Sequence, residues 1–453
     1  MKSINPFNLE VLEEFKEITS TDLEKTLAHT DKAFQTWKRA SYQDRGALFQ
    51  KLSTVLKTKS DSLAKMMTKE MGKRFSDAKA EIMKCAEACD HYAKHTEEFL
   101  KDQPVSTDGS QSFITFQPLG TILAIMPWNF PFWQVFRFAV PTLMAGNVGI
   151  LKHASNVSQC AVEIERLFIE AGFPNNILST VLLGSDKVAK LIADPRIKAV
   201  TLTGSTPAGK SVAENAGKNL KKCVLELGGS DAYVVLDDAD LKAAIEICAK
   251  SRLINSGQSC ISAKRFVVTS KVYEQFKEGL IEKFKSLRMG DPLDDNTTLA
   301  PLARTDLRDD LHKQVRKALE HGARLVYGGE IPHQEGAFYS PTILENINSE
   351  NPAYYEEFFG PVALLFKAKN EKEALAIAND SHFGLGAAVF TANTNHGVEI
   401  AKKELEAGSC FVNALVKSDS RLPFGGIKTS GFGRELSHFG IHEFVNIKTV
   451  YVK

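Results

Sequence analysis

The chain has 453 residues, enough for two or three domains with a large core. Its 56 lysines and arginines nearly balance its 55 aspartates and glutamates, so nothing in the composition indicates a polyanionic partner such as nucleic acid. Apolar runs such as 120–126 are much shorter than the roughly 20 residues needed to cross a membrane, and we expect no membrane-spanning helix. The seven cysteines are scattered and odd in number, and the N-terminus resembles neither a secretory signal nor a transit peptide, so the expected location is the cytoplasm.

The first hundred residues are predicted to be helical. Apolar residues recur every three or four positions between 22 and 99, which is typical of amphipathic helices, and 19–24 has the composition of a helix start. The same stretch holds four potential metal ligands, namely Cys85, Cys89, His91 and His95. They lack the paired short spacing of a zinc site, so we interpret them as parts of an amphipathic helix and predict no metal.

The remaining chain alternates between strand-like and helical segments. Residues 112–117 alternate like an exposed strand, and 119–126 are apolar throughout, like a buried one. From there to about residue 225 strands alternate with helices, which predicts a parallel, doubly wound sheet. A second set of strands after residue 226 predicts a second α/β domain, and 444–452 is predicted to be a further exposed strand.

Two residues near the predicted domain junction could carry chemistry. Glu226 lies in an apolar strand that runs into Gly228 and Gly229, and burial should raise the pKa of its carboxyl enough for a general base near neutral pH. Cys260 lies in a small polar loop, where it is a candidate nucleophile if nearby amides or a bound cation favour its thiolate. Each residue alone is more often structural. Their occurrence together on glycine-rich turns favours a catalytic cleft.

Six short motifs of this sequence also occur, in the same order along the chain, in one known superfamily of enzymes. They are Pro127-Trp128-Asn129-Phe130-Pro131, Thr203-Gly204-Ser205, Leu225-Glu226-Leu227-Gly228-Gly229, Gly257-Gln258-Ser259-Cys260, Glu357-Phe358-Phe359-Gly360-Pro361 and Pro423-Phe424-Gly425-Gly426. Through them the sequence resembles the aldehyde dehydrogenase superfamily along nearly its whole length. Three further segments, 132–138, 152–156 and 437–440, resemble the short bacterial succinate-semialdehyde dehydrogenases.

The resemblance implies a domain plan. A doubly wound Rossmann-type cofactor domain is expected over 1–103 and 118–226, with 417–438 packing back on it. A catalytic α/β domain is expected over 227–416. A small β arm for oligomerisation, made of 104–117 and 439–453, implies a homodimer or homotetramer.

The resemblance also implies a mechanism. Cys260 attacks an aldehyde, Asn129 and the Cys260 N–H donate to the developing oxyanion, and Glu226 activates the water that releases the thioester. Hydride must leave the aldehyde, and no side chain can accept it, so a nicotinamide cofactor is required. For Asn129, the local sequence fits an asparagine serving a proline turn nearly as well.

Seven residues are the expected cofactor contacts: Trp128, Lys152, Ser155, Gly204, Ser205, Glu357 and Phe359. In the family, a lysine like Lys152 holds the adenosine ribose and an acid like Glu357 bonds the nicotinamide ribose, with Phe359 beside the ring. Ser155 stands where NAD-preferring members often carry glutamate, an acid that would repel a 2′-phosphate. We therefore expect NADP to be accepted, or preferred, alongside NAD. The alternatives are that Ser155 caps a helix beginning at Val157 and that Glu357 is a solvated loop charge.

Other function classes also fit parts of the sequence. Residues 204–211 match the Walker A pattern, and 234–238 could pass for a Walker B strand, as in a phosphate-loop nucleoside triphosphatase. That alternative leaves Asn129, Glu226 and Cys260 without a role. A cysteine hydrolase or acyltransferase is a further alternative, which the lack of a histidine in the six motifs weakens.

Arg137 is the best indication of the substrate. It is the only charged residue in 130–143 and lies four positions after Trp133, on the same face if the stretch is helical. A guanidinium in so apolar a segment needs an anionic partner, either a substrate carboxylate or a nearby Asp or Glu. Ser418 and Phe424 complete the expected substrate contacts. The predicted substrate is succinate semialdehyde, with glutarate semialdehyde as the alternative.

Overall fold

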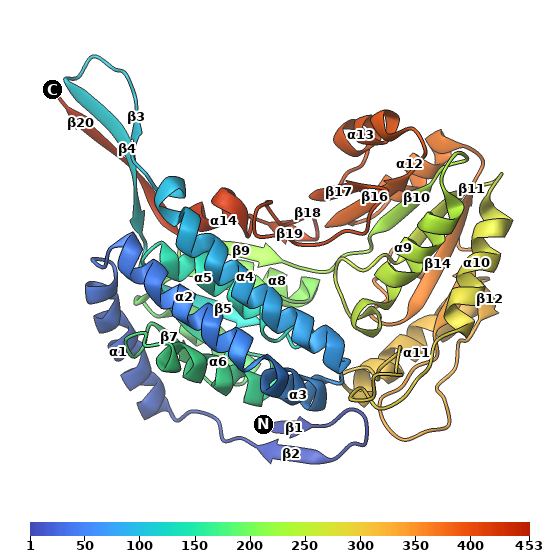
Figure 1. Cartoon of the computed structure of the whole chain (residues 1–453), viewed down its shortest axis with the longest axis horizontal. Helices are drawn as coiled ribbons and strands as arrows, with labels where there is room; N and C mark the ends of the chain where they lie inside the picture. The colour runs from blue at the N-terminus through green and yellow to red at the C-terminus, as the bar shows by residue number, and fades with distance from the viewer.

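The computed structural model describes residues 1–453 and contains two α/β units with a β arm projecting from one of them (Figure 1). The N-terminus forms a small hairpin of β1 (Lys2–Ile4) and β2 (Val11–Glu14). None of the helices has the length and apolar character required to cross a membrane.

The first unit is built on a six-stranded sheet. Its strands are β5 (Thr121–Met126), β6 (Val148–His153), β7 (Leu178–Thr180), β8 (Ile197–Thr203), β9 (Lys222–Glu226) and β19 (Gly431–Phe432). The spatial order is β19-β9-β8-β5-β6-β7, and only β19 is antiparallel. The chain leaves β5 in one direction, through β6 and β7, and returns on its other side through β8 and β9. A topological switch point therefore lies between β5 and β8, where ligands of doubly wound sheets bind.

Helices cover both faces of this sheet. They are α1 (Ser20–Trp37), α2 (Tyr42–Thr58), α3 (Ser60–Met71), α4 (Phe75–Phe99), α5 (Trp133–Met144), α6 (Ser158–Glu170), α7 (Val188–Ala193) and α8 (Thr206–Lys218). A core of 50 buried residues lies under α2 to α6, and a smaller core of 14 lies on the other face. The predicted helix start is correct, since the Thr19 hydroxyl accepts a hydrogen bond from the Asp22 N–H.

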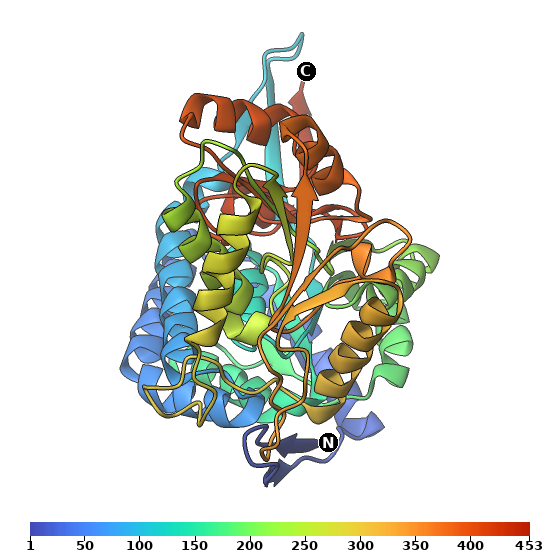
Figure 2. The same cartoon turned by 90° about the vertical axis from the view of Figure 1, so that its right-hand side faces the viewer.

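The second unit contains a seven-stranded sheet. Its strands, in spatial order, are β12 (Arg324–Tyr327), β13 (Thr342–Glu345), β14 (Val362–Ala368), β11 (Arg265–Thr269), β10 (Ala232–Val235), β16 (Gly386–Phe390) and β17 (Ser409–Val412). Its helices are α9 (Leu241–Leu253), α10 (Tyr273–Lys285), α11 (Thr305–Glu320), α12 (Glu371–Asn379) and α13 (Thr394–Lys403). Figure 2 faces this unit, with helices on both sides of the sheet. All neighbouring strands are parallel except β12 and β13, as expected for a second α/β domain.

The arm is a three-stranded sheet of β3 (Gln103–Pro104), β4 (Gln111–Pro118) and β20 (Val445–Val452). It therefore joins a segment from the first third of the chain to the C-terminal segment. β20 runs antiparallel to β4, with Val445 opposite Pro118 and Val452 opposite Gln111. The arm extends beyond the helical layer of the first unit (Figure 1). Helix α14 (Ser437–His442) precedes β20 and packs against α4 and α5, while β15 (Phe383–Gly384) pairs with β18 (Ile427–Lys428).

Candidate active site

The carboxyl ends of the central strands bring the predicted residues to one edge of the first sheet. Trp128 and Asn129 follow β5, Gly204 and Ser205 follow β8, and Glu226 is the last residue of β9. The Gly204 N–H donates to the Glu226 carbonyl at 2.9 Å, which ties the β8 loop to β9. Because β5 and β8 flank the switch point, this edge is the expected ligand crevice.

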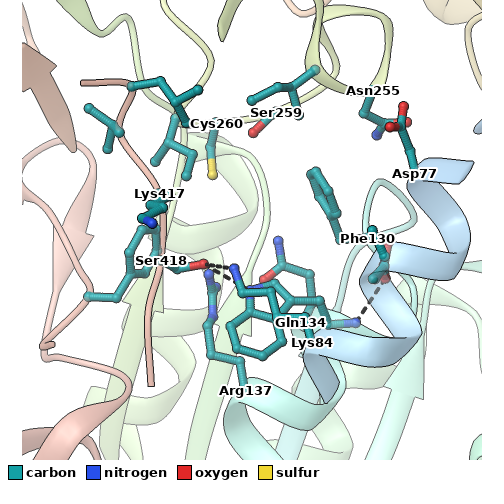
Figure 3. A pocket seen from close by; sticks show the side chains of 18 of the residues that line it. Asp77, Lys84, Phe130, Gln134, Arg137, Asn255, Ser259, Cys260, Lys417 and Ser418 are labelled. Atoms are coloured by element: carbon teal, nitrogen blue, oxygen red, sulfur yellow. Dashed lines mark hydrogen bonds between the residues drawn. The ribbon is translucent and has the colours of Figure 1, made fainter. Parts of the chain in front are cut away.

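A cavity of about 240 Å³ lies between the first unit, the cysteine loop and the 415–424 loop. Five of its lining residues were predicted as site residues from the sequence, namely Trp133, Arg137, Cys260, Ser418 and Phe424. Figure 3 shows the Cys260 sulfur directed into the cavity from one wall, with Arg137 and Lys84 across from it. Asn129 and Glu226 are buried beside this space and do not line its wall.

The loop that carries Cys260 has an unusual backbone. Asn255, Ser256 and Gly257 all have positive φ values, of 51°, 54° and 79°. A Cβ atom on Gly257 would collide with the backbone of Gly360, which follows Phe359, so only glycine allows these two loops to touch. The buried Arg252 guanidinium donates to the Gly257 carbonyl at 2.6 Å. The strained loop is therefore fixed by its neighbours, as is common where a reactive side chain must be held in place.

Asn129 is attached to the same loop. Its side-chain Nδ2 donates to the Gln258 carbonyl at 3.1 Å, and Asn255 donates to the Asn129 carbonyl at 2.8 Å. An asparagine amide has two N–H groups, so one remains for another acceptor. The Cys260 backbone N–H makes no hydrogen bond in the protein. Two donors are thus available beside the thiol.

The surroundings of Cys260 disfavour its thiolate in the ligand-free protein. Burial raises its pKa to about 12, and the positive charges of Lys264 and Arg137 offset this only partly. Lys264 Nζ is engaged elsewhere, because it donates to the Ser259 and Cys260 carbonyls at 2.7 and 2.6 Å and lies 3.4 Å from Glu357 Oε1. The condition stated for Cys260, a thiolate favoured by nearby amides or a bound cation, is therefore not met by the protein's own charges in the ligand-free state. A proton must leave when Cys260 attacks.

Glu226 has the buried setting that its sequence predicts. Its two carboxylate oxygens are buried and accept no hydrogen bond. Burial raises the pKa of this carboxyl, the nearby Glu435 raises it further, and Arg137 and Arg434 act in the opposite direction. Such a carboxyl can take a proton near neutral pH, which a general base requires.

Glu357 is fixed by the glycine pair after Glu226. Its Oε1 accepts from the Gly229 N–H at 3.0 Å and lies 3.4 Å from Lys264 Nζ. A side chain at Gly228 would collide with the Glu357 carboxylate, so the glycine is required for this approach. Glu357 is therefore not a freely solvated loop charge, unlike the neighbouring Glu356, which pairs with Lys317 near the surface. The Phe359 ring meets the Trp128 ring edge-on, with centroids 5.8 Å apart.

The remaining predicted cofactor residues lie along the strand edge. Lys152 is half-buried in β6, where burial lowers its pKa, and it has no ion-pair partner. Ser155 is exposed and makes no side-chain capping bond; the helix α6 begins at Ser158, so the helix-cap alternative does not hold. Ser205 is the N-cap of α8, and its hydroxyl accepts from the Ala208 N–H at 3.4 Å.

The nucleoside triphosphatase alternative fails on backbone geometry. Residues 206–209 already form the first turn of α8, so no loop precedes the helix that could wrap a triphosphate. The supposed Walker B strand, β10, belongs to the other sheet. The match to the Walker A pattern is therefore coincidental.

Arg137 has a partner within the protein. Its guanidinium forms an ion pair with Glu435, donates to the Thr203 hydroxyl at 3.2 Å and lies 4.6 Å from the Phe424 ring centroid. Of the two partners expected for Arg137, a substrate carboxylate or a nearby acid, the structure contains the acid, so the charge of Arg137 alone no longer requires an anionic substrate. Trp133 and Ser418 do meet in the cavity, since Trp133 Nε1 donates to Ser418 Oγ at 3.1 Å.

Three important residues were missed from the sequence. Glu435 partners Arg137, Glu81 accepts hydrogen bonds from the Phe132 and Trp133 N–H groups at 2.9 Å each, and Lys84 lines the cavity. Glu81 also forms a buried ion pair with Lys73. The sequence offered one indication of the roles of Glu81 and Lys84. Both fall on the apolar face of a long amphipathic helix, beside Cys85 and Ala88. Lysine stems commonly cover apolar surface, so this signal is weak.

Comparison with known proteins agrees with this geometry. Residues 1–450 match the sequence model of the aldehyde dehydrogenase family. A probable succinate-semialdehyde dehydrogenase [NADP(+)] of Synechocystis is 48% identical over 450 residues, covering 99% of each chain. The succinate semialdehyde dehydrogenase [NAD(P)+] Sad of Escherichia coli is 46% identical over 449 residues, covering 99% of this chain and 97% of its own. A crystal structure of succinic semialdehyde dehydrogenase from Streptococcus pyogenes in complex with NADP+ superimposes with a TM-score of 0.98, at 42% identity and over 100% of this chain and 99% of that one.

Proposed function

The chain belongs to the aldehyde dehydrogenase family, and we propose that it oxidises succinate semialdehyde to succinate with NADP or NAD as hydride acceptor. The observation that carries the proposal is the placement of Cys260 on the wall of a cavity, with Asn129 attached to its loop and Glu226 buried nearby. The substrate is supported by the two relatives named above, whose names specify succinate semialdehyde.

The chain's own residues can perform the chemistry in two stages. Cys260 adds to the aldehyde carbon as its thiol proton passes to water, while the free Asn129 N–H and the Cys260 N–H donate to the oxygen as it becomes negative. A bound nicotinamide cofactor supplies the hydride acceptor, since no side chain can fill that role. Glu226 then removes a proton from the water that hydrolyses the thioester, which releases the acid.

The residues along the strand edge suit a dinucleotide. Glu357 is anchored with one carboxylate oxygen still able to accept from a ribose hydroxyl, and Phe359 and Trp128 offer an aromatic surface beside it. Gly204 and Ser205 lie at the N-terminus of α8, where helix amides favour a pyrophosphate. Lys152, which has no ion-pair partner, would hold the adenosine ribose.

Ser155 is the residue that we assign to cofactor choice. It is exposed, lies three positions after Lys152 in the chain and brings no negative charge, so a 2′-phosphate meets no repulsion from it. Ser155→Glu is expected to lower the NADP/NAD ratio of kcat/KM by about tenfold or more, the effect of about 1.4 kcal/mol of lost binding. An unchanged ratio would show that another residue selects the cofactor.

The reaction is tested by following reduced-nicotinamide absorbance with each cofactor and a panel of succinate semialdehyde, glutarate semialdehyde and butanal. Highest kcat/KM is expected for succinate semialdehyde, and Cys260→Ala should abolish all turnover. Turnover by Cys260→Ala would refute the assignment of the nucleophile. If kcat/KM is highest for glutarate semialdehyde, the substrate is the five-carbon semialdehyde instead.

We further infer that the enzyme acts in the cytoplasm as a homodimer or homotetramer. The projecting arm supports self-association, because β20 presents a free strand edge with exposed apolar side chains. Its partners would then be other copies of this chain and its small-molecule aldehyde.

A further inference from the structure

Lys84, which lines the substrate cavity, is a half-buried cation without an anionic partner. Lys84 of α4 is half-buried, and no carboxylate lies within ion-pair distance of its Nζ. By contrast, the two buried cations beside it are paired, Lys73 with Glu81 and Arg137 with Glu435. A half-buried ammonium without a counter-ion is costly unless a ligand supplies one. The only other unpaired cation in the lining, Lys417, is exposed.

The groups around Lys84 leave several hydrogen-bond donors unused. Lys84 Nζ donates to Ser418 Oγ at 2.7 Å and lies 4.1 Å from the Trp133 ring centroid. Ser418 Oγ also accepts from Trp133 Nε1 at 3.1 Å, so its own hydrogen is free to be donated. An ammonium has three N–H groups, of which one is used. Lys84 and Ser418 together can therefore donate to a carboxylate.

Lys84 lies where the cavity opens outward. Together with Ala80, Lys417 and Ser418, it also lines an adjoining outer cavity of about 550 Å³ whose other walls are polar. The Cys260 sulfur faces the inner cavity across from Lys84 (Figure 3). A ligand that spans the inner cavity thus has its reactive carbon at Cys260 and its far end at Lys84.

We propose that Lys84, together with Ser418, binds the distal carboxylate of the substrate and makes the enzyme selective for anionic semialdehydes. The inference rests on the proposed function and assigns the charged contact to a residue other than Arg137. Arg137, already neutralised by Glu435, positions Phe424 and the cavity floor. Carboxylate recognition by a lysine and a hydroxyl needs no rearrangement of the Arg137–Glu435 pair.

The charges around Lys84 predict how its protonation affects binding. Burial, and then the charge of Arg137 on α5, lower the pKa of Lys84 to about 8, whereas Cys85 and Glu81 on α4 and Asp419 in the neighbouring loop act in the opposite direction. Lys84 is thus mostly protonated at neutral pH and loses its charge above pH 8. KM for succinate semialdehyde should rise above that pH, while KM for butanal should not follow it.

The experiment compares succinate semialdehyde with butanal, which has the same number of carbons and no charge. Lys84→Met should lower the ratio of their kcat/KM values by at least about tenfold, mainly through KM, because the carboxylate loses a charge-assisted contact. Lys84→Arg should retain most of the ratio and remove the rise of KM above pH 8. Lys94→Met, an exposed lysine on the same helix, is the matched control and should leave the ratio unchanged.

The outcomes separate this inference from the proposed function. A wild-type preference for succinate semialdehyde that persists in Lys84→Met would overturn the inference and leave the function standing. Loss of the preference in Arg137→Ala alone would return the contact to Arg137. Equal losses for both aldehydes in Lys84→Met would mean that Lys84 only supports the fold. If the wild-type kcat/KM for butanal equals that for succinate semialdehyde, the substrate proposal and the role of Lys84 are both overturned.

Discussion

Glu226 is held in surroundings that oppose its charge. Its carboxylate oxygens have no hydrogen-bond donor, and Glu435 lies close enough to add repulsion. A structural carboxylate would normally be paired or solvated, so this arrangement has a cost in stability. Because a general base works best with a pKa near the working pH, the same cost is useful to catalysis.

The destabilisation caused by the buried Glu226 carboxylate should appear in the pH dependence of the free energy of unfolding. The folded-state pKa of Glu226 lies above its unfolded value, so between the two the folded protein binds more protons, and stability falls as pH rises. Glu226→Gln removes the titrating group. At pH 8 we expect the variant to be more stable than the wild type, by about 1–2 kcal/mol, and the difference to shrink towards pH 5. Chemical denaturation at both pH values measures this difference in the free energy of unfolding, and a variant less stable than the wild type at pH 8 would show that Glu226 is not destabilised by its surroundings.

Helix α5 depends on a cap supplied by another helix. Its own sequence provides no capping side chain before Trp133, and Glu81 of α4 accepts its first free N–H groups instead. Lys73 pairs with Glu81 and lies 3.7 Å from the Phe130 ring centroid. This buried pair thereby fixes the turn that carries Asn129 and the helix that carries Trp133.

Removing the charge of Glu81 should weaken both the fold and the site. Glu81→Gln leaves the Lys73 ammonium buried without a counter-ion, so we expect a loss of about 3 kcal/mol in the free energy of unfolding. Glu98→Gln on the same helix, which breaks an exposed pair with Lys101, should cost less than about 1 kcal/mol. Urea denaturation of both variants checks this, and equal stability would show that the buried pair is dispensable.

The elements themselves were largely predictable, because their signals are local. Helical periodicity located α1 to α4, and continuous apolar runs located the central strands β5, β8, β10 and β11. The hairpin β1–β2 and the edge strands β12 and β17 were not predicted, because short, partly exposed strands carry little apolar pattern.

The site was predictable only in part, for a related reason. Motif resemblance placed Cys260, Glu226 and Asn129, which the fold does bring together. Resemblance also placed Trp133 and Ser418 in one site, but the contact of Lys84 with Ser418, 334 positions away, left no trace in the sequence. The partner of Arg137 was unpredictable in the same way, since Glu435 reaches it from the far end of the chain.

The molecule as a whole exposes an arm that is too thin to have a core of its own. Ile447 and Tyr451 of β20 are 63% and 49% exposed and lie on one face of the strand. Apolar side chains beside an unpaired strand edge favour contact with another copy of the chain.

Charges on this face should prevent assembly. The double variant Ile447→Asp, Tyr451→Asp is expected to reduce the molar mass measured by light scattering from that of a dimer or tetramer towards that of one chain. Lys448→Gln, on the opposite face of the same strand, should leave the mass unchanged. A wild-type protein that is monomeric at micromolar concentration would contradict the role of the arm.

In the proposed reaction, Cys260 forms a covalent thioester and Glu226 activates the water that hydrolyses it. Glu226→Gln mixed with NADP+ and succinate semialdehyde should release one equivalent of reduced cofactor per active site and then stall. Mass spectrometry should find the succinyl group on the peptide containing Cys260. Steady turnover by Glu226→Gln without a burst, or an acyl group on another residue, would rule out these roles for Glu226 and Cys260.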